Sequence, residues 1–333
     1  MLKWLRRSAA SSEEPSSEKV VPLRGRSPED VLRRVEWTVL RRLDGVLHGD
    51  YRTLFRGYGL DLADLREYQY GDDVRHIDWN VTARLQSPYV REYHEDREIT
   101  AWFLLDLSPS VDFGSEDVRK RAVSEQFVGA VARLLTRHGN RVGALVYGSG
   151  VERVVPAGSG RSHVLRILHA MQGRRDSGGK KTDLSELLGA AGHMLRRRSL
   201  VFLVSDFYSE PGWTGRLGFL ARRHETIAVR LYDPIESELP DLGLVPFRDA
   251  ETGEELLVDT HDPAFARRFA EAGARREAAL RAAFAQAGVD ALELSTGEDL
   301  VEALRRFIEL RKRRGRIASR SAPHDHDVRE ALA

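Results

Sequence analysis

One carboxylate and two hydroxyls stand close together in the stretch Asp106-Leu107-Ser108-Pro109-Ser110. The preceding residues, 99–105, form a continuous apolar run, which predicts a buried central strand. The side chains therefore stand where that strand ends, which is where ligands bind in open α/β sheets. Oxygen ligands on a tight loop suit Mg²⁺ or Mn²⁺ and leave coordination places free. The plain alternative is that Asp106 and the two serines only make local turn hydrogen bonds.

Two later segments add further oxygen ligands. Residues 200–206 form a second apolar strand that ends on Asp206. If this strand is parallel and adjacent to the first, Asp206 falls beside Asp106. Thr182 precedes Asp183, which is typical of a helix cap, so the Thr182 hydroxyl either points elsewhere or is only part of that cap. The predicted metal ligands are Asp106, Ser108, Ser110, Thr182 and Asp206.

Alternating strand and helix patterns surround these residues. Strands are expected at 99–105, 141–147, 151–156, 200–206, 226–232 and 291–294, and helices at 29–47, 116–137, 161–171, 182–198, 213–222, 263–287 and 298–312. Only Gly148-Ser149-Gly150 separates 141–147 from 151–156, which predicts an antiparallel hairpin. Segments 242–247 and 255–258 predict a β-hairpin insertion, and 90–95 is a candidate extra edge strand. The pattern predicts an α/β fold, doubly wound, with a mostly parallel sheet and one antiparallel edge strand.

Composition excludes several classes of site and partner. The 333 residues hold 52 Lys and Arg against 51 Asp and Glu, so the net charge of +1 gives no general attraction to nucleic acid or acidic membranes. The absence of cysteine excludes disulfides, thiolate metal sites and cysteine nucleophiles. No apolar stretch reaches the roughly 18–20 residues of a transmembrane segment. The amino-terminal residues lack the apolar core of a secretory signal, so we expect a cytoplasmic protein.

The same composition predicts four regions along the chain. Residues 1–28 are expected to be a disordered leader, 29–97 a segment that packs on the sheet, 98–312 the α/β domain and 313–333 a disordered basic tail. Within the second region, residues 65–84 are dense in charged and aromatic side chains. We single out Arg66, Glu67, Tyr68, Gly71, Asp72, Asp73, Arg75, Asp78, Trp79 and Arg84. The arginines are candidate partners for the carboxylates, and we favour a structural network that supports the sheet over a contact surface.

The five oxygen ligands resemble the metal-ion-dependent adhesion site of the von Willebrand factor A fold. Its pattern is Asp-x-Ser-x-Ser, a distant Thr, and an Asp after a later strand. The resemblance implies that Ser108, Ser110 and Thr182 bind Mg²⁺ directly or nearly so. It also implies that Asp106 and Asp206 act largely through waters, while a partner's Asp or Glu completes the octahedron.

Together with the string from Leu65 to Arg84, this pattern resembles the domain-of-unknown-function 58 family over roughly residues 52–311. Members look like von Willebrand A-type proteins and are often associated with MoxR-type AAA+ ATPases. The resemblance implies a bacterial Mg²⁺-dependent protein interaction module for assembly or remodelling of client complexes. The chain departs from the usual adhesion-site pattern at Val111, where Met is common, and at Phe207, where Gly is common, and we expect Phe207 to affect access to the ion.

An enzymatic alternative is a Mg²⁺-dependent phosphohydrolase with Asp106 as the nucleophile at the strand end. The phosphatase fold that works in this way needs a second Asp two residues later, and that position holds Ser108. No Gly-x-Ser-x-Gly elbow of a serine hydrolase is present. We therefore assign no catalytic residue from the sequence.

Overall fold

The computed structural model describes residues 27–46, 64–70, 72–74, 77–92, 99–114, 118–172, 181–248 and 255–321. The strands are β1 (Asp64–Glu67), β2 (Tyr89–Glu92), β3 (Thr100–Asp106), β4 (Arg141–Tyr147), β5 (Val151–Gly158), β6 (Leu200–Ser205), β7 (Glu225–Tyr232), β8 (Leu244–Arg248), β9 (Glu255–Asp259) and β10 (Asp290–Ser295). The longer helices are α5 (Lys120–Arg137), α6 (Arg161–Met171), α7 (Leu184–Met194), α8 (Trp213–Arg223), α9 (Pro263–Ala287) and α10 (Leu300–Ser321). The shorter helical elements are α1 (Pro28–Arg34), η1 (Val35–Leu40), α2 (Arg41–Val46), α4 (Trp79–Leu85), η3 (Pro109–Asp112) and η4 (Pro234–Glu236).

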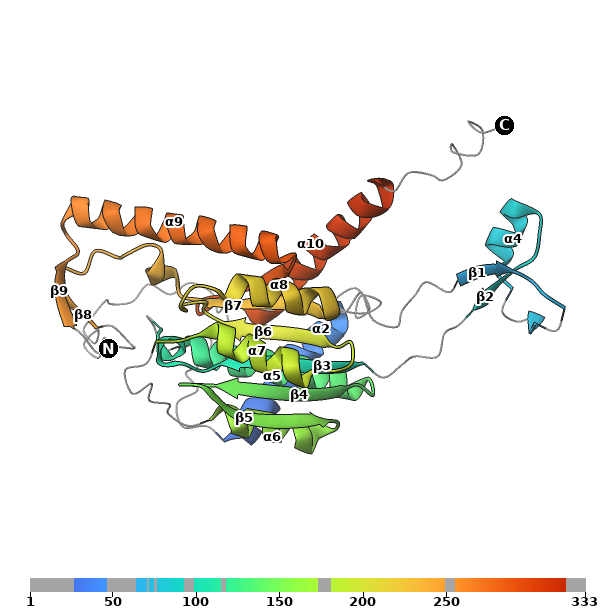
Figure 1. Ribbon diagram of the computed structural model, residues 1–333, viewed down its shortest axis with the longest axis horizontal. Coiled ribbons are helices and arrows are strands. Elements are labelled where there is room, and N and C mark those ends of the chain that lie inside the picture. Colours follow the sequence, from blue (N-terminus) through green and yellow to red (C-terminus); the bar gives the residue numbers. More distant parts are fainter. Residues whose placement is uncertain are drawn as a thin grey trace, which may run out of the picture.

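A six-stranded sheet forms the centre of the molecule, in the order β10-β7-β6-β3-β4-β5 (Figure 1). All neighbours in it are parallel except β4 and β5, which form the predicted antiparallel hairpin at one edge. The two apolar strands β3 and β6 are adjacent and parallel, in register from Ala101–Leu200 to Leu105–Val204. The chain proceeds outward from β3 in one direction and from β6 in the other. Their junction is therefore the switch point at which open α/β sheets bind ligands.

Helices cover both faces of this sheet, as expected for a doubly wound fold (Figure 1). Alternate residues of β3 enter different cores, because side chains of a strand alternate between faces. Phe103 stacks on Phe202 with ring centroids 5.2 Å apart, in the core that includes α5, α6 and α10. Leu104 points to the other core, which includes α7, α8 and α9. Both faces of the strand are thus buried, which explains its uninterrupted apolar sequence.

The amino-terminal helix runs without a break from α1 through the π-helical η1 to α2. Ser27 caps it by accepting a hydrogen bond from the Asp30 amide, and Pro28 is its first residue, so these two residues belong to the helix rather than to the predicted leader. Val35 is buried and lies close to Gly129 of α5 and Leu168 of α6. The helix predicted at 29–47 is confirmed, and it packs on the helical layer rather than directly on the sheet.

The second part of the amino-terminal region is a small unit of its own. β1 pairs antiparallel with β2, from Asp64–Glu92 to Glu67–Tyr89, and α4 lies between them in sequence. In Figure 1 this unit lies apart from the six-stranded sheet. The prediction of an extra edge strand at 90–95 was wrong, because β2 finds its hydrogen-bonding partner in β1. The region predicted as one segment over 29–97 therefore contains two separate described parts.

The largest differences from the predicted helix ends are in α5, which begins at Lys120 instead of 116, and in α7 and α10. α7 ends at Met194 instead of 198, because Leu195 is buried and extended and leads the chain into β6. α10 continues through Ser321, nine residues into the predicted disordered tail at 313–333. Arg311 pairs with Asp290 at 3.0 Å, and Arg314 pairs with the same carboxylate at 2.5 Å, so ion pairs to the sheet hold this basic helix. Residues 1–26 and 322–333 lie outside the described part. Among the described helices, none is long and apolar enough to cross a membrane.

Candidate metal centre

The first loop of the site begins at Asp106, the last residue of β3. Its Oδ1 accepts a hydrogen bond from the Ser108 amide at 3.0 Å, and its Oδ2 accepts one from the Ser205 hydroxyl at 2.6 Å. The Ser108 and Ser110 hydroxyl oxygens lie 3.1 Å apart. Asp106 and Ser108 are fully buried. The loop thus presents two neighbouring hydroxyls over a carboxylate that is itself held in place.

The second loop follows β6 and lies against the first. Ser205 joins them, because its hydroxyl donates to Asp106 and accepts a hydrogen bond from the Phe207 amide at 2.8 Å. Asp206 is 1% exposed, and its Oδ1 accepts a hydrogen bond from the Tyr208 amide at 3.1 Å. Burial, together with the nearby charge of Asp206, raises the pKa of Asp106 from 3.8 to about 6. The two carboxylates therefore lie close enough to repel each other.

The third loop contains Thr182, which is 3% exposed. Its carbonyl accepts a hydrogen bond from the Glu210 amide of the β6 loop at 2.9 Å. The next amide, of Asp183, donates to the Tyr147 hydroxyl at 3.0 Å, and Tyr147 is the register partner of Asp106. The three loops predicted to converge therefore meet at the carboxyl ends of β3, β4 and β6. Asp183 also caps α7 by accepting from the Ser185 amide at 2.8 Å.

The chemistry of this donor set fits a small, hard cation. Ligands of an octahedral Mg²⁺ at about 2.1 Å from the ion lie about 3.0 Å from one another. The 3.1 Å between the Ser108 and Ser110 hydroxyls matches that spacing. Two buried carboxylates beside them supply negative charge that a cation would neutralise. Among the described residues, no group of three or more His, Asp or Glu side chains could hold a metal ion, so a cation bound here would depend on the hydroxyls.

Lys120 is a third charged group at this edge, and no motif in the sequence singles it out. Its Nζ lies 2.7 Å from Oδ2 of Asp206 and 2.6 Å from Oε1 of Glu236, and its side chain is 1% exposed. Burial alone would lower the pKa of Lys120, but the charges of the two carboxylates and their hydrogen bonds raise it above its usual value. Lys120 is therefore a buried ammonium group that joins the loops after β6 and β7.

The neighbouring residue, Arg121, contacts the first loop. Its Nε and Nη2 lie 2.5 and 3.1 Å from the two carboxylate oxygens of Asp112, which is a bidentate pair. Nη2 also donates to the Leu107 carbonyl at 3.4 Å, and Nη1 donates to the Met171 carbonyl at 3.3 Å. Arg121 therefore connects the serine loop with the end of α6.

Comparison with protein families decides the family of this chain. The family described as "Protein of unknown function DUF58" matches residues 64–279, which is more than half of the chain. The chain belongs to the DUF58 family. The match begins at β1 and ends within α9, so it includes the small amino-terminal unit and all three loops of the site.

Several DUF58-like relatives are mycobacterial. Uncharacterized protein Rv1480 of Mycobacterium tuberculosis is 38% identical over 292 residues, which cover 86% of this chain and 90% of that protein. Uncharacterized protein Mb1516 of Mycobacterium bovis matches to the same extent. Uncharacterized protein MAV169 of Mycobacterium avium is 35% identical over 169 residues, which cover 50% of this chain and 98% of that protein. A crystal structure of an aerotolerance-related membrane protein from Bacteroides fragilis covers 64% of this chain and 99% of its own, with TM-score 0.41 and 12% identity.

The DUF58 sequence block at 65–84 lies in the β1–α4–β2 unit. Asp72 accepts a hydrogen bond from the Gln69 amide at 2.8 Å, and Asp78 accepts one from the Val81 amide at 3.3 Å. These two carboxylates shape a turn and the start of α4. Trp79, by contrast, is 69% exposed. Within the block, Glu67, Asp73 and Arg84 are exposed, Tyr68 is half-buried, and Gly71, Arg75 and the side chain of Arg66 lie outside the described residues.

Phe207 follows Asp206 and is one of the two departures from the adhesion-site pattern that the sequence resembles. Its backbone is left-handed, with φ of 59°, a region that favours glycine. The side chain is 4% exposed and packs against Trp213 and Phe284, with ring centroids 5.3 and 4.9 Å away. The Phe207 ring is therefore buried in the core, and the expectation that Phe207 affects access to the ion stays a prediction. Val111, the other departure, is fully buried.

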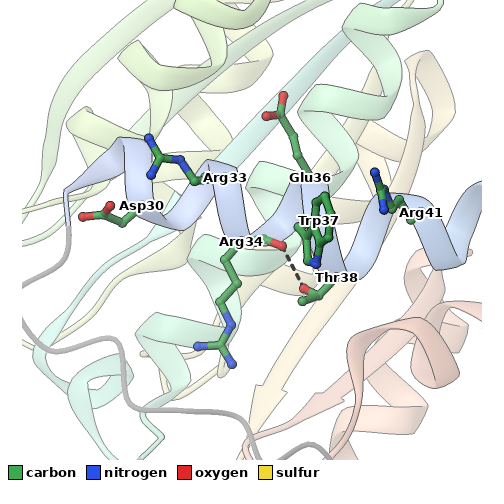
Figure 2. Close-up of a pocket in the computed structure, with 7 residues that line it drawn as sticks. All are labelled: Asp30, Arg33, Arg34, Glu36, Trp37, Thr38 and Arg41. Carbon is green, nitrogen blue, oxygen red and sulfur yellow. Dashed lines mark hydrogen bonds between the residues drawn. The ribbon is translucent and has the colours of Figure 1, made fainter.

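A groove of about 790 Å³ runs along the amino-terminal helix of this DUF58 protein (Figure 2). The ring of Trp37 is 65% exposed, and the Arg41 guanidinium carbon lies 3.8 Å from its centroid. Glu36 is already paired with Arg133 at 2.6 Å. The described residues that line the groove all come from this one helix: Asp30, Arg33, Arg34, Glu36, Trp37, Thr38 and Arg41. It contains none of the strand-end groups, so the metal centre is the stronger candidate site.

Proposed function

We propose that this protein is a Mg²⁺-dependent protein interaction module of the von Willebrand A type. Ser108, Ser110 and Thr182 would hold the ion, and Asp106 and Asp206 would act largely through waters. The observation that carries the proposal is the pair of hydroxyls 3.1 Å apart beside two buried carboxylates, at the switch point of the sheet. The strand order and the antiparallel edge strand support the same fold type.

A bound ion would supply a concentrated positive charge at this edge, with a coordination place for an acidic side chain of a partner. The chain's own residues fix where that charge sits. The Ser205 hydroxyl and the Ser108 amide hold the Asp106 carboxylate, so the loop need not reorganise to receive a cation. A small contact of this kind can dominate binding while burying little surface.

The family resemblance suggests the class of partner. We propose a MoxR-type AAA+ ATPase, or a client protein that such an ATPase helps to assemble or remodel, engaged through an Asp or Glu. The phosphohydrolase alternative has less support, because the Asp106 carboxylate is fully buried and each of its oxygens already accepts a hydrogen bond. A nucleophile needs an oxygen that can reach the substrate.

Titration with Mn²⁺ tests the metal site directly. We expect the wild type to bind one ion and Ser110→Ala to weaken that binding by about tenfold or more, because a direct ligand is lost. Ser162→Ala is the matched control, since Ser162 is exposed on α6 and far along the chain from the loops. Equal affinity of all three proteins, or no saturable binding by the wild type, would overturn the proposal.

Capture of a purified MoxR-type ATPase from the same genome tests the partner. We expect capture in Mg²⁺, loss of capture in chelator, and loss in Ser110→Ala when that variant melts like the wild type. Capture that is the same with Mg²⁺ and with chelator would show that the ion plays no part in the interaction.

A further inference from the structure

We infer that Lys120 and Arg121, adjacent residues in the first turn of α5, are positioning residues that hold the loops of the metal centre in place. The part of this inference that concerns ion binding rests on the proposed function. The holding of the loops does not, because it is a property of the metal-free protein. The two side chains start from one helix end and contact different loops.

Lys120 acts on the loops after β6 and β7. Its ammonium group lies within 2.7 Å of Asp206 and 2.6 Å of Glu236, whose side chains are 0% and 14% exposed. Burying an ammonium group costs free energy unless it is paired, so loss of either carboxylate contact would destabilise the folded state. Asp206 then has one oxygen on Lys120 and the other on the Tyr208 amide. Because both oxygens are engaged, Asp206 is disposed to contact an ion through water rather than directly.

Arg121 acts on the loop that presents the two serines. Its bidentate pair with Asp112 and its bond to the Leu107 carbonyl fall on both sides of Ser108 and Ser110. Its bond to the Met171 carbonyl fixes the end of α6, the helix that precedes the Thr182 segment. A planar guanidinium suits this task, because it can bind a carboxylate and carbonyl groups in one plane.

A close backbone approach joins the start of α5 to the serine loop. The Lys120 amide donates to the Phe113 carbonyl at 3.0 Å. A Cβ atom at Gly114 would lie 2.2 Å from the Val118 carbonyl oxygen and 2.8 Å from the Arg119 Cα. Only glycine permits that approach, so the serine loop and the first turn of α5 are built as one unit. Displacing that turn would disturb the loops held by Lys120 and by Arg121 together.

Hydrogen–deuterium exchange in the metal-free protein separates the two roles. We expect Arg121→Gln to raise exchange in 106–112 with little change in 205–210, and Lys120→Met to do the reverse. Glu236→Gln removes the charge of one carboxylate partner and leaves Lys120 in place. It replaces Lys120→Met in this experiment if that variant does not fold. The matched control is Arg133→Gln, because Arg133 lies on the same helix and pairs with Glu36 at 2.6 Å, away from the loops. Equal increases in both loops for each variant would overturn the inference.

Mn²⁺ affinity supplies the second measurement. Groups that orient metal ligands typically change affinity by about 10–100-fold when removed. We expect a loss in that range for Lys120→Met and Arg121→Gln, partial rescue by Lys120→Arg, and no change for Arg133→Gln. Wild-type affinity in all variants would overturn the inference. If the wild type binds no Mn²⁺ while the loop-selective exchange is seen, the proposed function fails and the positioning roles stand.

Discussion

The strand-end site and the small β1–α4–β2 unit are built in opposite ways, although both are rich in polar side chains. In the strand-end site, contacts join residues far apart in the sequence, such as Lys120 with Asp206 and Ser205 with Asp106. In the small unit, the described side-chain bonds of Asp72 and Asp78 reach amides three residues away. The first is therefore a product of the whole fold, and the second is locally formed.

Exposure follows the same division. The predicted ligands Asp106, Ser108, Thr182 and Asp206 are at most 3% exposed, whereas Tyr70 and Trp79 of the small unit are largely in solvent. Exposed aromatic side chains are common at protein interfaces. The comparison teaches that long-range contacts between buried side chains shape the strand-end site, whereas the β1–α4–β2 unit leaves aromatic side chains in solvent. The predictions below test that division, from the largest expected effect to the smallest.

Truncating the core behind the site should have the largest effect on stability. Phe103 is fully buried between Phe127 and Phe202, so Phe103→Ala should lower the free energy of unfolding by about 3–5 kcal/mol. Urea denaturation measures the change. Phe219 of α8 is 55% exposed, and Phe219→Ala should cost less than about 0.5 kcal/mol. Equal losses in the two variants would contradict the assignment of Phe103 to the core.

At Phe207, the free energy gained by packing the ring opposes the cost of a left-handed backbone. Replacement by Gly loses about 3–5 kcal/mol of packing and regains about 1 kcal/mol by relieving the left-handed backbone, for a net loss of about 2–4 kcal/mol. Replacement by Ala loses the packing but keeps the strain, so Phe207→Ala should unfold at a lower urea concentration than Phe207→Gly. If the alanine variant is as stable as the glycine variant, the strain at this position is negligible.

Glu125 on α5 should make stability depend on pH. Burial, and to a lesser extent the charge of Asp112, raises the pKa of Glu125 from 4.5 to about 7, although Arg121 opposes the shift. The folded state therefore favours the protonated form, and this contribution to stability is lost as pH rises through about 7. Glu125→Gln should stabilise the protein by about 2–3 kcal/mol at about pH 8.5 and have little effect near pH 5.

Thermal melts at the two pH values measure the effect of Glu125→Gln. Glu309→Gln is the control, because Glu309 is exposed on α10. The same gain at both pH values would show that ionisation of Glu125 is not its source.

Trp79 should have the smallest effect on stability and tests the contact role of the small unit. Because its ring is 69% exposed, Trp79→Ala should change the unfolding free energy by less than about 0.5 kcal/mol. If the small unit contacts the proposed ATPase, capture of that ATPase should nevertheless weaken, because exposed tryptophans often carry a large share of binding energy. Full capture by the variant would leave the block with a structural role only.

The sequence was sufficient for most of the fold because its signals are local. The apolar runs at 99–105 and 200–206 are strands buried on both faces, and the three-residue Gly148–Gly150 loop can only join an antiparallel pair. The convergence of the loops after β3 and β6 then follows from these strands being adjacent and parallel, whereas the Thr182 loop joins them through its contacts with Glu210 and Tyr147.

The residues that support the site carry no such local signal. Lys120 stands between two arginines and looks like part of a solvated helix start. Its burial depends on Asp206 and Glu236, which lie 86 and 116 residues further along the chain. The basic run from Arg311 likewise looks like a tail, but Arg311 pairs with Glu225 and Asp290, and Arg314 also pairs with Asp290. The hydrophobic periodicity of a sequence does not reveal long-range ion pairs of this kind.

The π-helical stretch Val35–Leu40 should let the amino-terminal helix tolerate the deletion of one residue. A π turn accommodates one residue more than an α turn. Deletion of Trp37 could therefore be absorbed by tightening that turn, with Val31 and Leu43 kept facing the core. The same deletion within α5 would rotate its buried stripe by about 100°. Related proteins that differ in length by one residue here can thus share an identical packing of this helix.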